Sequence, residues 1–356
     1  MAKIDTLFKE MLGHGGSDLH LSQGQPPKIR RHGRIIPLQH PVLTYDQLSE
    51  MFKEICPPDR WRHYKKTGDL DFAYSFADNT ARFRGNLFIQ LHGIGGVFRQ
   101  IPARIQTIDE LQLPPVLKTF AWIRQGLVLV TGPTGSGKST TLAGILDFVN
   151  TNYARHILTI EEPIEFIHTD KRSVYCQREV GLDVNSFSDG LQASTRQDTD
   201  IILVGEMRTA QEIGLAISAA AKGSLVFATL HTNSAVKTID RIIDAFPAEE
   251  QGQVRSMLAD VLRGVVAQLL VRTPDGNGRT AVHEILVGIP SLGAAIRTGN
   301  ISNIRNIIAG GKKFGMQMMD DCIAAGITKG IIDPLDGYMK ALDKKRFIQY
   351  APRELQ

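Results

Sequence analysis

The chain has 356 residues, of which 42% are hydrophobic and 22% are charged, and it carries a net charge of +4. This composition is typical of globular proteins, and the length suffices for two domains of about 150 residues each. No apolar run reaches the roughly 20 residues of a membrane-spanning helix, and no basic run indicates a nucleic-acid-binding tail. We therefore expect a protein that meets a membrane only through partners and that has no nucleic-acid partner.

The cysteines and the N-terminus indicate where the protein works. Cys56, Cys176 and Cys322 are odd in number and far apart, which argues against a disulfide framework and against a zinc site. The first residues mix charges into a helical pattern and lack the apolar core of a signal peptide. These features predict a cytoplasmic protein.

Residues 1–100 alternate between short helical and extended patterns. Apolar residues spaced three and four apart predict a helix over residues 3–13. Thr44, with acidic residues after it, predicts the start of a second helix that ends at Ile55, before Pro57. Alternating polar and apolar residues predict strands at residues 17–22, 28–30, 34–36, 70–76, 81–89 and 94–98. We therefore predict a small α+β domain with an antiparallel sheet.

The remainder of the chain predicts a larger α/β domain over residues 119–356. It follows a linker, residues 101–118, that contains prolines and no sustained periodicity and passes into a short helix at residues 116–123. Helical stretches separate four apolar runs, which predicts a parallel sheet covered on both faces; the runs are residues 126–130, 157–160, 201–204 and 225–228. From residue 247 to the end we predict mainly helix, with a long helix over residues 250–270.

Residues 132–140, GPTGSGKST, fit the phosphate-loop pattern at every fixed position. The apolar strand before them and the helical pattern after them are the context that the pattern requires, so a chance glycine-rich turn is a poor alternative. Lys138 is expected to reach the β and γ phosphates of ATP, and the Ser139 hydroxyl to bind Mg²⁺. The residues predicted to bind the nucleotide are Thr134, Gly135, Ser136, Gly137, Lys138, Ser139 and Thr140.

Polar residues follow each of the other three predicted strands, where the ligand of an open parallel sheet lies. Glu206 is predicted to polarise the water that attacks the γ phosphate. Glu162 and Glu165 are predicted to support Mg²⁺ through waters or to assist the base. His231 either senses the γ phosphate or caps the strand end, and Glu161 is either a surface acid or a functional one.

Two further features bear on the charge at this site. Gly205 stands where an Asp commonly helps to hold Mg²⁺, so we expect another carboxylate to supply that ligand. Phosphoryl transfer also needs positive charge, and in multimeric ATPases an arginine often comes from a neighbouring subunit. Arg82, Arg84 and Arg99 lie on predicted strands of the first domain, although an exposed arginine is most often a solvated surface residue.

Together these segments resemble the Walker A, Asp box, Walker B and His box of the type II/type IV secretion ATPases, at residues 131–141, 157–165, 204–208 and 229–233. The resemblance runs in the same order along nearly the whole chain, and it is strongest to the pilus-retraction branch. It implies a PAS-like N-terminal domain, a RecA-like second domain and a homohexamer with each nucleotide between domains and subunits. It also implies that Arg84 and Arg99 contact the phosphates, with Arg82 a weaker candidate.

In function, the resemblance implies a Mg²⁺-dependent ATPase at the cytoplasmic face of the bacterial inner membrane. Such a motor pulls on an inner-membrane platform protein to disassemble a type IV pilus, the basis of twitching motility. The chain departs from the family pattern at Glu162, where Asp is usual, and at His92, Thr209, Lys222 and Ser224. In residues 291–298 only Ile296 and Arg297 match the retraction signature. Two alternatives therefore stay open: a regulatory subunit that joins a paralogous ATPase, and a motor for pilus assembly or type II secretion.

Overall fold

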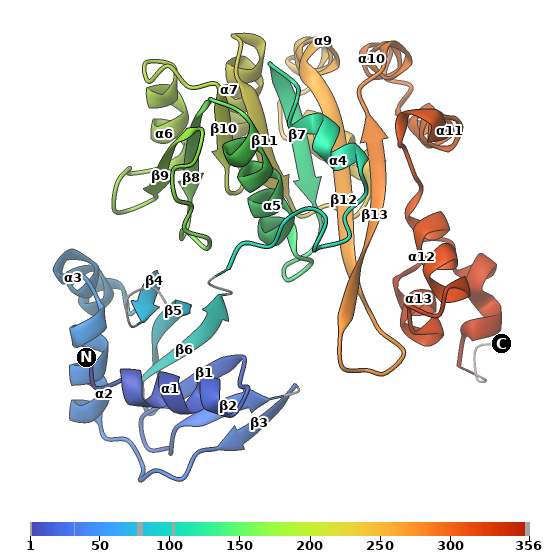
Figure 1. Cartoon of the computed structure of the whole chain (residues 1–356). Coiled ribbons are helices and arrows are strands. Elements are labelled where there is room, and N and C mark those ends of the chain that lie inside the picture. The colour runs from blue at the N-terminus through green and yellow to red at the C-terminus, as the bar shows by residue number, and fades with distance from the viewer. Residues whose placement is uncertain (1, 32, 77–80, 102–103, 353–356) are drawn as a thin grey trace. The chain divides into compact units, whose positions relative to one another are not determined.

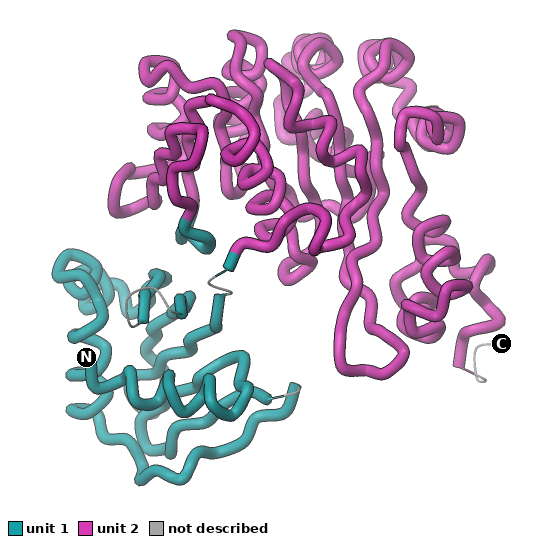
Figure 2. Tube along the Cα trace, viewed as in Figure 1, with its two compact units in different colours: residues 1–104, 162–167 teal, residues 105–161, 168–356 magenta. Residues whose placement is uncertain are grey.

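The computed structural model describes residues 2–31, 33–76, 81–101 and 104–352. The chain divides into two compact units, shown in teal and magenta in Figure 2. The first is residues 1–104 together with residues 162–167, and the second is residues 105–161 and 168–356. Residues 162–167 follow a strand of the second unit along the chain, so no sequence pattern indicates that they group with the first.

The first unit is an antiparallel sheet with three helices, as expected of an α+β domain. The helices are α1 (Asp5–Gly13), α2 (Tyr45–Ile55) and α3 (Pro58–Thr67). The strands are β1 (Asp18–Ser22), β2 (Lys28–Arg31), β3 (Arg34–Pro37), β4 (Asp69–Phe76), β5 (Ala81–Gln90) and β6 (Gly93–Ile101), in the order β3-β2-β1-β6-β5-β4. Phe8 of α1 stacks on Phe83 of β5 with ring centroids 4.0 Å apart, so the core joins helix to sheet.

The helix boundaries of the first unit follow from local chemistry. Thr44 caps α2 with a capping box, as the sequence predicts: its hydroxyl accepts from the Gln47 N–H and the Gln47 side chain accepts from the Thr44 N–H. The helix predicted from Thr44 ends before Pro57, and no helix is predicted directly after it, so α3 is missing from the prediction. Proline suits the first turn of a helix, where its missing N–H has no intrahelical partner, and α3 begins at Pro58.

The sheet of the second unit has the order β13-β12-β7-β11-β10-β8-β9 (Figure 1). The four predicted strands are confirmed as β7 (Gly126–Thr131), β8 (His156–Glu161), β10 (Ile201–Val204) and β11 (Leu225–Leu230), all parallel to their neighbours. The sequence analysis missed β9 (Val174–Glu179), which adds a parallel edge strand. The other strands are β12 (Leu262–Arg272), parallel to β7, and β13 (Arg279–Val287), antiparallel to β12.

The prediction of one helix over residues 250–270 is wrong. A helix, α9 (Gln251–Val261), covers only the first half, and the chain then enters β12. Most of β12 is buried, so its sequence is a mainly apolar run that does not alternate, with Gln268 as a polar residue within it. Such a run fits a buried helix and a buried strand equally well by periodicity, and here it pairs with β7 and β13.

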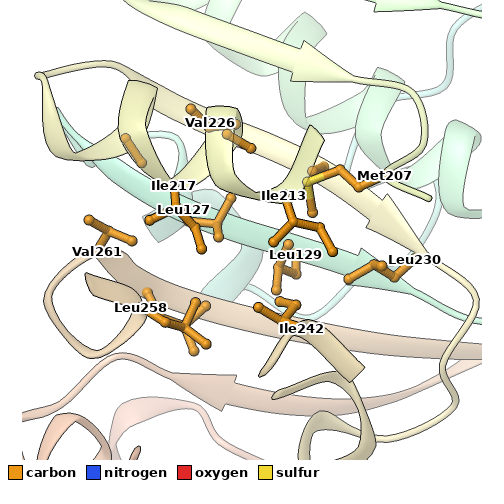
Figure 3. Close-up of a cluster of buried hydrophobic side chains, with 14 of the residues drawn as sticks. Leu127, Leu129, Met207, Ile213, Ile217, Val226, Leu230, Ile242, Leu258 and Val261 are labelled. Carbon is orange, nitrogen blue, oxygen red and sulfur yellow. The ribbon is translucent and has the colours of Figure 1, made fainter. Parts of the chain in front are cut away.

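Helices cover both faces of this sheet. They are α4 (Val116–Phe120), α5 (Lys138–Asn152), α6 (Phe187–Ser194), α7 (Ala210–Ala221), α8 (Ala235–Asp244), α9, α10 (Pro290–Arg297), α11 (Ile304–Gly310), α12 (Met319–Thr328) and α13 (Pro334–Lys340), with 3₁₀ turns at Ile301–Asn303, Lys312–Phe314 and Lys344–Tyr350. Leu127 and Leu129 of β7 pack with α7 and α9 (Figure 3), whereas Val128 and Val130 pack with α4 and α5. Of the helices described, none has the length and apolar character needed to span a bilayer.

Candidate nucleotide site

The phosphate loop joins the end of β7 to the start of α5, as predicted. Gly135 and Gly137 have φ of 77° and 86°, in the left-handed region that favours glycine. Lys138 donates through Nζ to the carbonyl oxygens of Gly132 and Pro133, at 2.7 and 3.2 Å, so the ammonium group lies against the loop. Because Lys138 and Ser139 begin a 15-residue helix, the free N–H groups and dipole of its first turn favour an anion beside them.

Strand register brings the predicted strand-end residues to one edge of the sheet. Leu230 pairs with Thr131, and Val204 pairs with both Ala228 and Ile160. The carboxyl ends of β7, β11, β10 and β8 therefore lie at the same edge of the sheet, whose strands are shown in Figure 1. The phosphate loop, His231 and Glu206 all leave the sheet at this edge.

Glu206 is held by two donors at that edge. Its Oε2 accepts from Arg208 Nη2 at 2.8 Å, and its Oε1 lies 2.8 Å from His231 Nε2. A carboxylate oxygen only accepts, so the proton of His231 must lie on Nε2. Burial alone raises the pKa of Glu206, but the hydrogen bonds and charges of Arg208 and His231 outweigh it, and the pKa lies below its ordinary value. Glu206 is therefore ionised at neutral pH, and the structure gives His231 a donor role.

The two residues that follow Glu206 in the sequence help to set the position of its side chain. Met207 is 2% exposed and packs beside Ile213 and Leu230 in the core (Figure 3), and its N–H donates to Thr229 O. Met207 is buried between Glu206 and Arg208, and these two side chains meet outside the core, where Arg208 Nη2 donates to Glu206 Oε2. No role in the site was predicted for Arg208 from the sequence, although its place two residues after Glu206, across an apolar residue, is a signal that could have found it.

Gly205 lies where the chain ends of β10 and β8 approach closely. Its N–H donates to Ile160 O at 2.8 Å, and a Cβ at this position would lie 3.2 Å from that oxygen and 3.3 Å from Glu161 Cα. A side chain here has little room, which accounts for glycine in place of the usual Asp.

The acids after β8 separate into two groups. Glu161 ends β8 itself, and its Oε1 accepts from Thr159 Oγ1 at 2.6 Å and from Gln177 Nε2 at 3.3 Å. These bonds give Glu161 a structural role in the sheet. Glu162 and Glu165 belong to the segment that groups with the first unit, where Glu165 Oε1 lies 3.8 Å from Arg84 Nη1.

Arg84 and Arg99 face each other directly across β5 and β6. Arg99 donates from Nε to Asp18 Oδ1 at 2.8 Å, and Arg84 Nε lies 3.9 Å from Asp71 Oδ1. Burial raises the pKa of Asp18, but hydrogen bonds from Ser17 and Arg99 outweigh it and hold the pKa below its ordinary value. The two exposed arginines are thus adjacent in the sheet, and each has a carboxylate beside it that offsets the repulsion between them.

Arg82 is engaged differently from these two arginines. Its Nε donates to Ile164 O at 3.1 Å, and its Nη1 donates to Ser75 Oγ at 2.9 Å. Arg82 thus fastens the segment of residues 162–167 within the first unit. Of the three arginines named from the sequence, the structure brings Arg84 and Arg99 together and uses Arg82 as a structural clamp.

The residues that depart from the family pattern around α7 and β11 keep local roles. Thr209 caps α7 in a capping box with Glu212, a role that Asp also performs. Ser224 donates to Thr199 O at 3.1 Å, and Lys222 ends α7. Both Lys222 and Ser224 precede β11, whereas His231 follows it, so they lie at the opposite end of the strand from His231.

Comparison with known proteins gives consistent matches over almost the whole chain. The "Type IV pilus retractation ATPase PilT" of Pseudomonas aeruginosa is 45% identical over 94% of this chain and 96% of its own length. The "Type IV pilus ATPase PilU" of the same organism is 38% identical over 93% of this chain and 86% of its own length. A crystal structure of the pilus retraction motor PilT with bound ADP matches with a TM-score of 0.89 and 36% identity, covering 98% of this chain and all of that one.

A family model agrees with these matches. The model described as "Type II/IV secretion system protein" matches residues 104–331, a span that includes the phosphate loop and the Glu206 cluster. The sequence resemblance is thereby confirmed, and so is the order of an α+β N-terminal domain followed by a mostly parallel ATPase domain. This chain belongs to the type II/IV secretion system protein family.

Proposed function

We propose that this chain is a Mg²⁺-dependent ATPase that works as a homohexameric motor for type IV pilus retraction. The observation that carries the proposal is the position of Glu206, with Arg208 and His231, at the same sheet edge as the phosphate loop. That edge offers a phosphate site and an ionised carboxylate together. Similarity to the PilT retraction ATPase over 94% of the chain supports the choice of motor.

In this proposal each residue has a defined task. The N–H groups of residues 134–140 and the Lys138 ammonium bind the phosphates, and the Ser139 hydroxyl, with Glu162 through water, holds the metal. Mg²⁺ neutralises charge on the β and γ phosphates when it is bound. Glu206 orients the attacking water and accepts its proton, while Arg208 and His231 keep Glu206 ionised and oriented.

Arg84 and Arg99 supply the remaining positive charge in this proposal. Their exposure, 42% and 66% of the side chain, and their position opposite each other suit them to an anion brought by another subunit. We place the ring at the cytoplasmic face of the inner membrane, where it acts on an integral platform protein. The ring itself then meets the membrane only through that partner.

A steady-state ATPase assay tests the enzymatic part of the proposal. The purified protein should hydrolyse ATP only with Mg²⁺, and Glu206→Gln should lower kcat by about 100-fold or more. Lys138→Ala should abolish turnover without loss of the folded state, as followed by circular dichroism. Turnover by Lys138→Ala equal to the wild type would rule out the phosphate loop as the active site.

A deletion strain tests the direction of the motor. Loss of a retraction motor leaves excess surface pili, and return of the wild-type gene, but not of Glu206→Gln, should remove them. Absence of pili after deletion would instead indicate the assembly or secretion motor left open by the sequence.

One observation favours a second candidate, a regulatory subunit that joins a paralogous ATPase. Of the retraction signature, the matching residues Ile296 and Arg297 have structural contacts: Ile296 is fully buried and Arg297 forms an ion pair with Asp260. The other residues of the segment 291–298 differ from the retraction signature. In addition, a second pilus ATPase, PilU, is similar to this chain. ATPase activity of the isolated protein no higher than that of Glu206→Gln would favour the regulator.

A further inference from the structure

Gln268 is a buried polar residue of β12 whose hydrogen bonds lead to the phosphate loop and its supports. The residue is 2% exposed. Its Nε2 donates to Ser136 O at 2.7 Å, and its Oε1 accepts from Thr141 Oγ1, in the first turn of α5, at 2.7 Å. The third partner is His283 Nε2 of β13, which lies 3.1 Å from Oε1. One amide group therefore links the loop, the helix after it and two strands.

The partners leave the Gln268 amide a single orientation. The carbonyl of Ser136 only accepts, so the amide nitrogen must face it. The amide oxygen then faces two donors, the Thr141 hydroxyl and Nε2 of His283. Burial lowers the pKa of His283 to about 4, so its ring is neutral at physiological pH and donates through Nε2–H.

Two glycines of the loop, Gly132 and Gly137, lie very close to Gln268. A Cβ at Gly137 would lie 2.8 Å from Gln268 Nε2, and one at Gly132 would lie 2.3 Å from Gln268 O. Ser136 stands between these two glycines, and its buried hydroxyl has no hydrogen-bond partner among the residues that the structure describes. The loop thus bends closely around Gln268, and Ser136 is tied to Gln268 by its carbonyl rather than its hydroxyl.

We propose that Gln268 is a positioning residue for nucleotide binding, which fixes the bend of the phosphate loop by holding Ser136 O and is itself held by Thr141 and His283. It acts through the loop and does not contact the nucleotide. The N–H groups of such a loop converge on a phosphate only while the loop keeps its bend. The inference rests on the nucleotide binding proposed above and adds a residue from outside every family motif found in the sequence.

The first test removes the hydrogen bonds and keeps the volume. Gln268→Met should weaken ADP binding by the full-length protein, measured by isothermal titration calorimetry, by about tenfold or more, because small displacements of binding groups have large effects. Gln251→Met is the matched control, since Gln251 Nε2 donates to the carbonyl of Phe246 in the same unit, away from the loop. The control should bind ADP as the wild type does.

The second test separates positioning from packing. In Gln268→Glu the carboxylate has no proton to donate to Ser136 O, whereas the protonated acid has the shape and the donor of the amide. Burial raises the pKa of such a carboxyl group, so protonation should begin well above the ordinary range. Affinity relative to the wild type, measured at each pH between about 8 and 5.5, should therefore rise as the pH falls. In the wild-type reference His283 has a pKa of about 4, so the reference itself does not change through His283 over that range.

The outcomes decide the inference independently of the motor proposal. Wild-type affinity in Gln268→Met, or a relative affinity of Gln268→Glu that does not change with pH, would overturn it. A Gln268→Glu protein that fails to fold even at the lowest pH would also count against it, because the protonated acid matches the amide in shape. If the wild type binds ADP but does not hydrolyse ATP, the motor proposal fails while both affinity tests remain valid.

Discussion

Glu206 shows at the scale of single residues how a strand end can present an ionised carboxylate. The carboxylate is oriented by one fixed cation, Arg208, and by one titratable donor, His231, and both lower its pKa. A carboxylate with a lowered pKa stays ionised, and able to accept a proton, down to a lower pH than a free one. The acid limit of the ATPase reaction should therefore lie at unusually low pH.

Removal of Arg208 should move that limit. In Arg208→Gln the largest opposing influence on the pKa of Glu206 is gone, so burial raises the pKa and the acid limb of the kcat/KM profile should shift to higher pH. Arg279→Gln, which changes an exposed arginine at the start of β13, is the control and should leave the profile in place. An unshifted acid limb in Arg208→Gln would mean that another group titrates.

Asp18 provides a second prediction at this scale, for stability. Its lowered pKa means that its ion pair with Arg99 stabilises the fold above the ordinary carboxyl pKa of about 4, and that this contribution is lost as the pH falls through the folded value. Asp18→Asn should therefore cost about 1–2 kcal/mol of unfolding free energy at pH 7. Asp71→Asn, where the distance to Arg84 is 3.9 Å and the side chain is 48% exposed, should change stability little in the same denaturant titration.

At the residue scale, the sequence predicts those site residues that lie next to a recognisable strand or motif. The phosphate loop, Glu206 and His231 follow buried strands directly, so their shared edge could be predicted from topology alone. Gln268 could not be found in this way, because its partner Ser136 is 132 residues distant and it fell within a stretch predicted as helix. Whether Glu162, Glu165, Arg84 and Arg99 act in catalysis stays a prediction for mutagenesis.

At the scale of elements, the errors of sequence-based prediction have separate physical causes. Strand β12 is buried along most of its length, so it lacks the alternation of polar and apolar residues that marks most strands. Helix α3 begins at a proline, a residue that suits the first turn of a helix but also marks breaks between elements. In contrast, β5 alternates buried and partly exposed residues from Ala81 to Phe88 and was predicted correctly. Burial on both faces removes the periodicity on which such reasoning depends.

Helix α7 carries a prediction about a departure from the family pattern. Thr209→Ala removes a capping box and should lower the unfolding free energy by about 1 kcal/mol. Thr209→Asp, which restores the residue usual in the family, keeps an acceptor for the Glu212 N–H and should leave the melting temperature almost unchanged. Thr298→Ala, at the C-terminal end of α10, serves as a control for loss of a threonine outside an N-cap.

At the scale of the whole molecule, the proposed ring predicts that inactive subunits can rescue each other. If Arg84 of one subunit serves the phosphate loop of the next, Arg84→Ala and Lys138→Ala should each be inactive alone. Mixed rings then contain sites with an intact loop from one variant and an intact arginine from the other. ATPase activity should therefore reappear on mixing, and its absence in verified mixed hexamers would mean that the arginine acts within its own subunit.

The contact between Gln268 and Ser136 also has a consequence for the order in which the site is made. The ribosome completes the phosphate loop, Glu206 and His231 long before it adds β12, and until then β7 lacks its neighbour on one side. A nascent chain that ends near residue 250 would hold all four motifs of the nucleotide site and still lack the support that shapes the loop. We therefore expect full nucleotide affinity to be reached late in the synthesis of this protein, once its last two strands have joined the sheet.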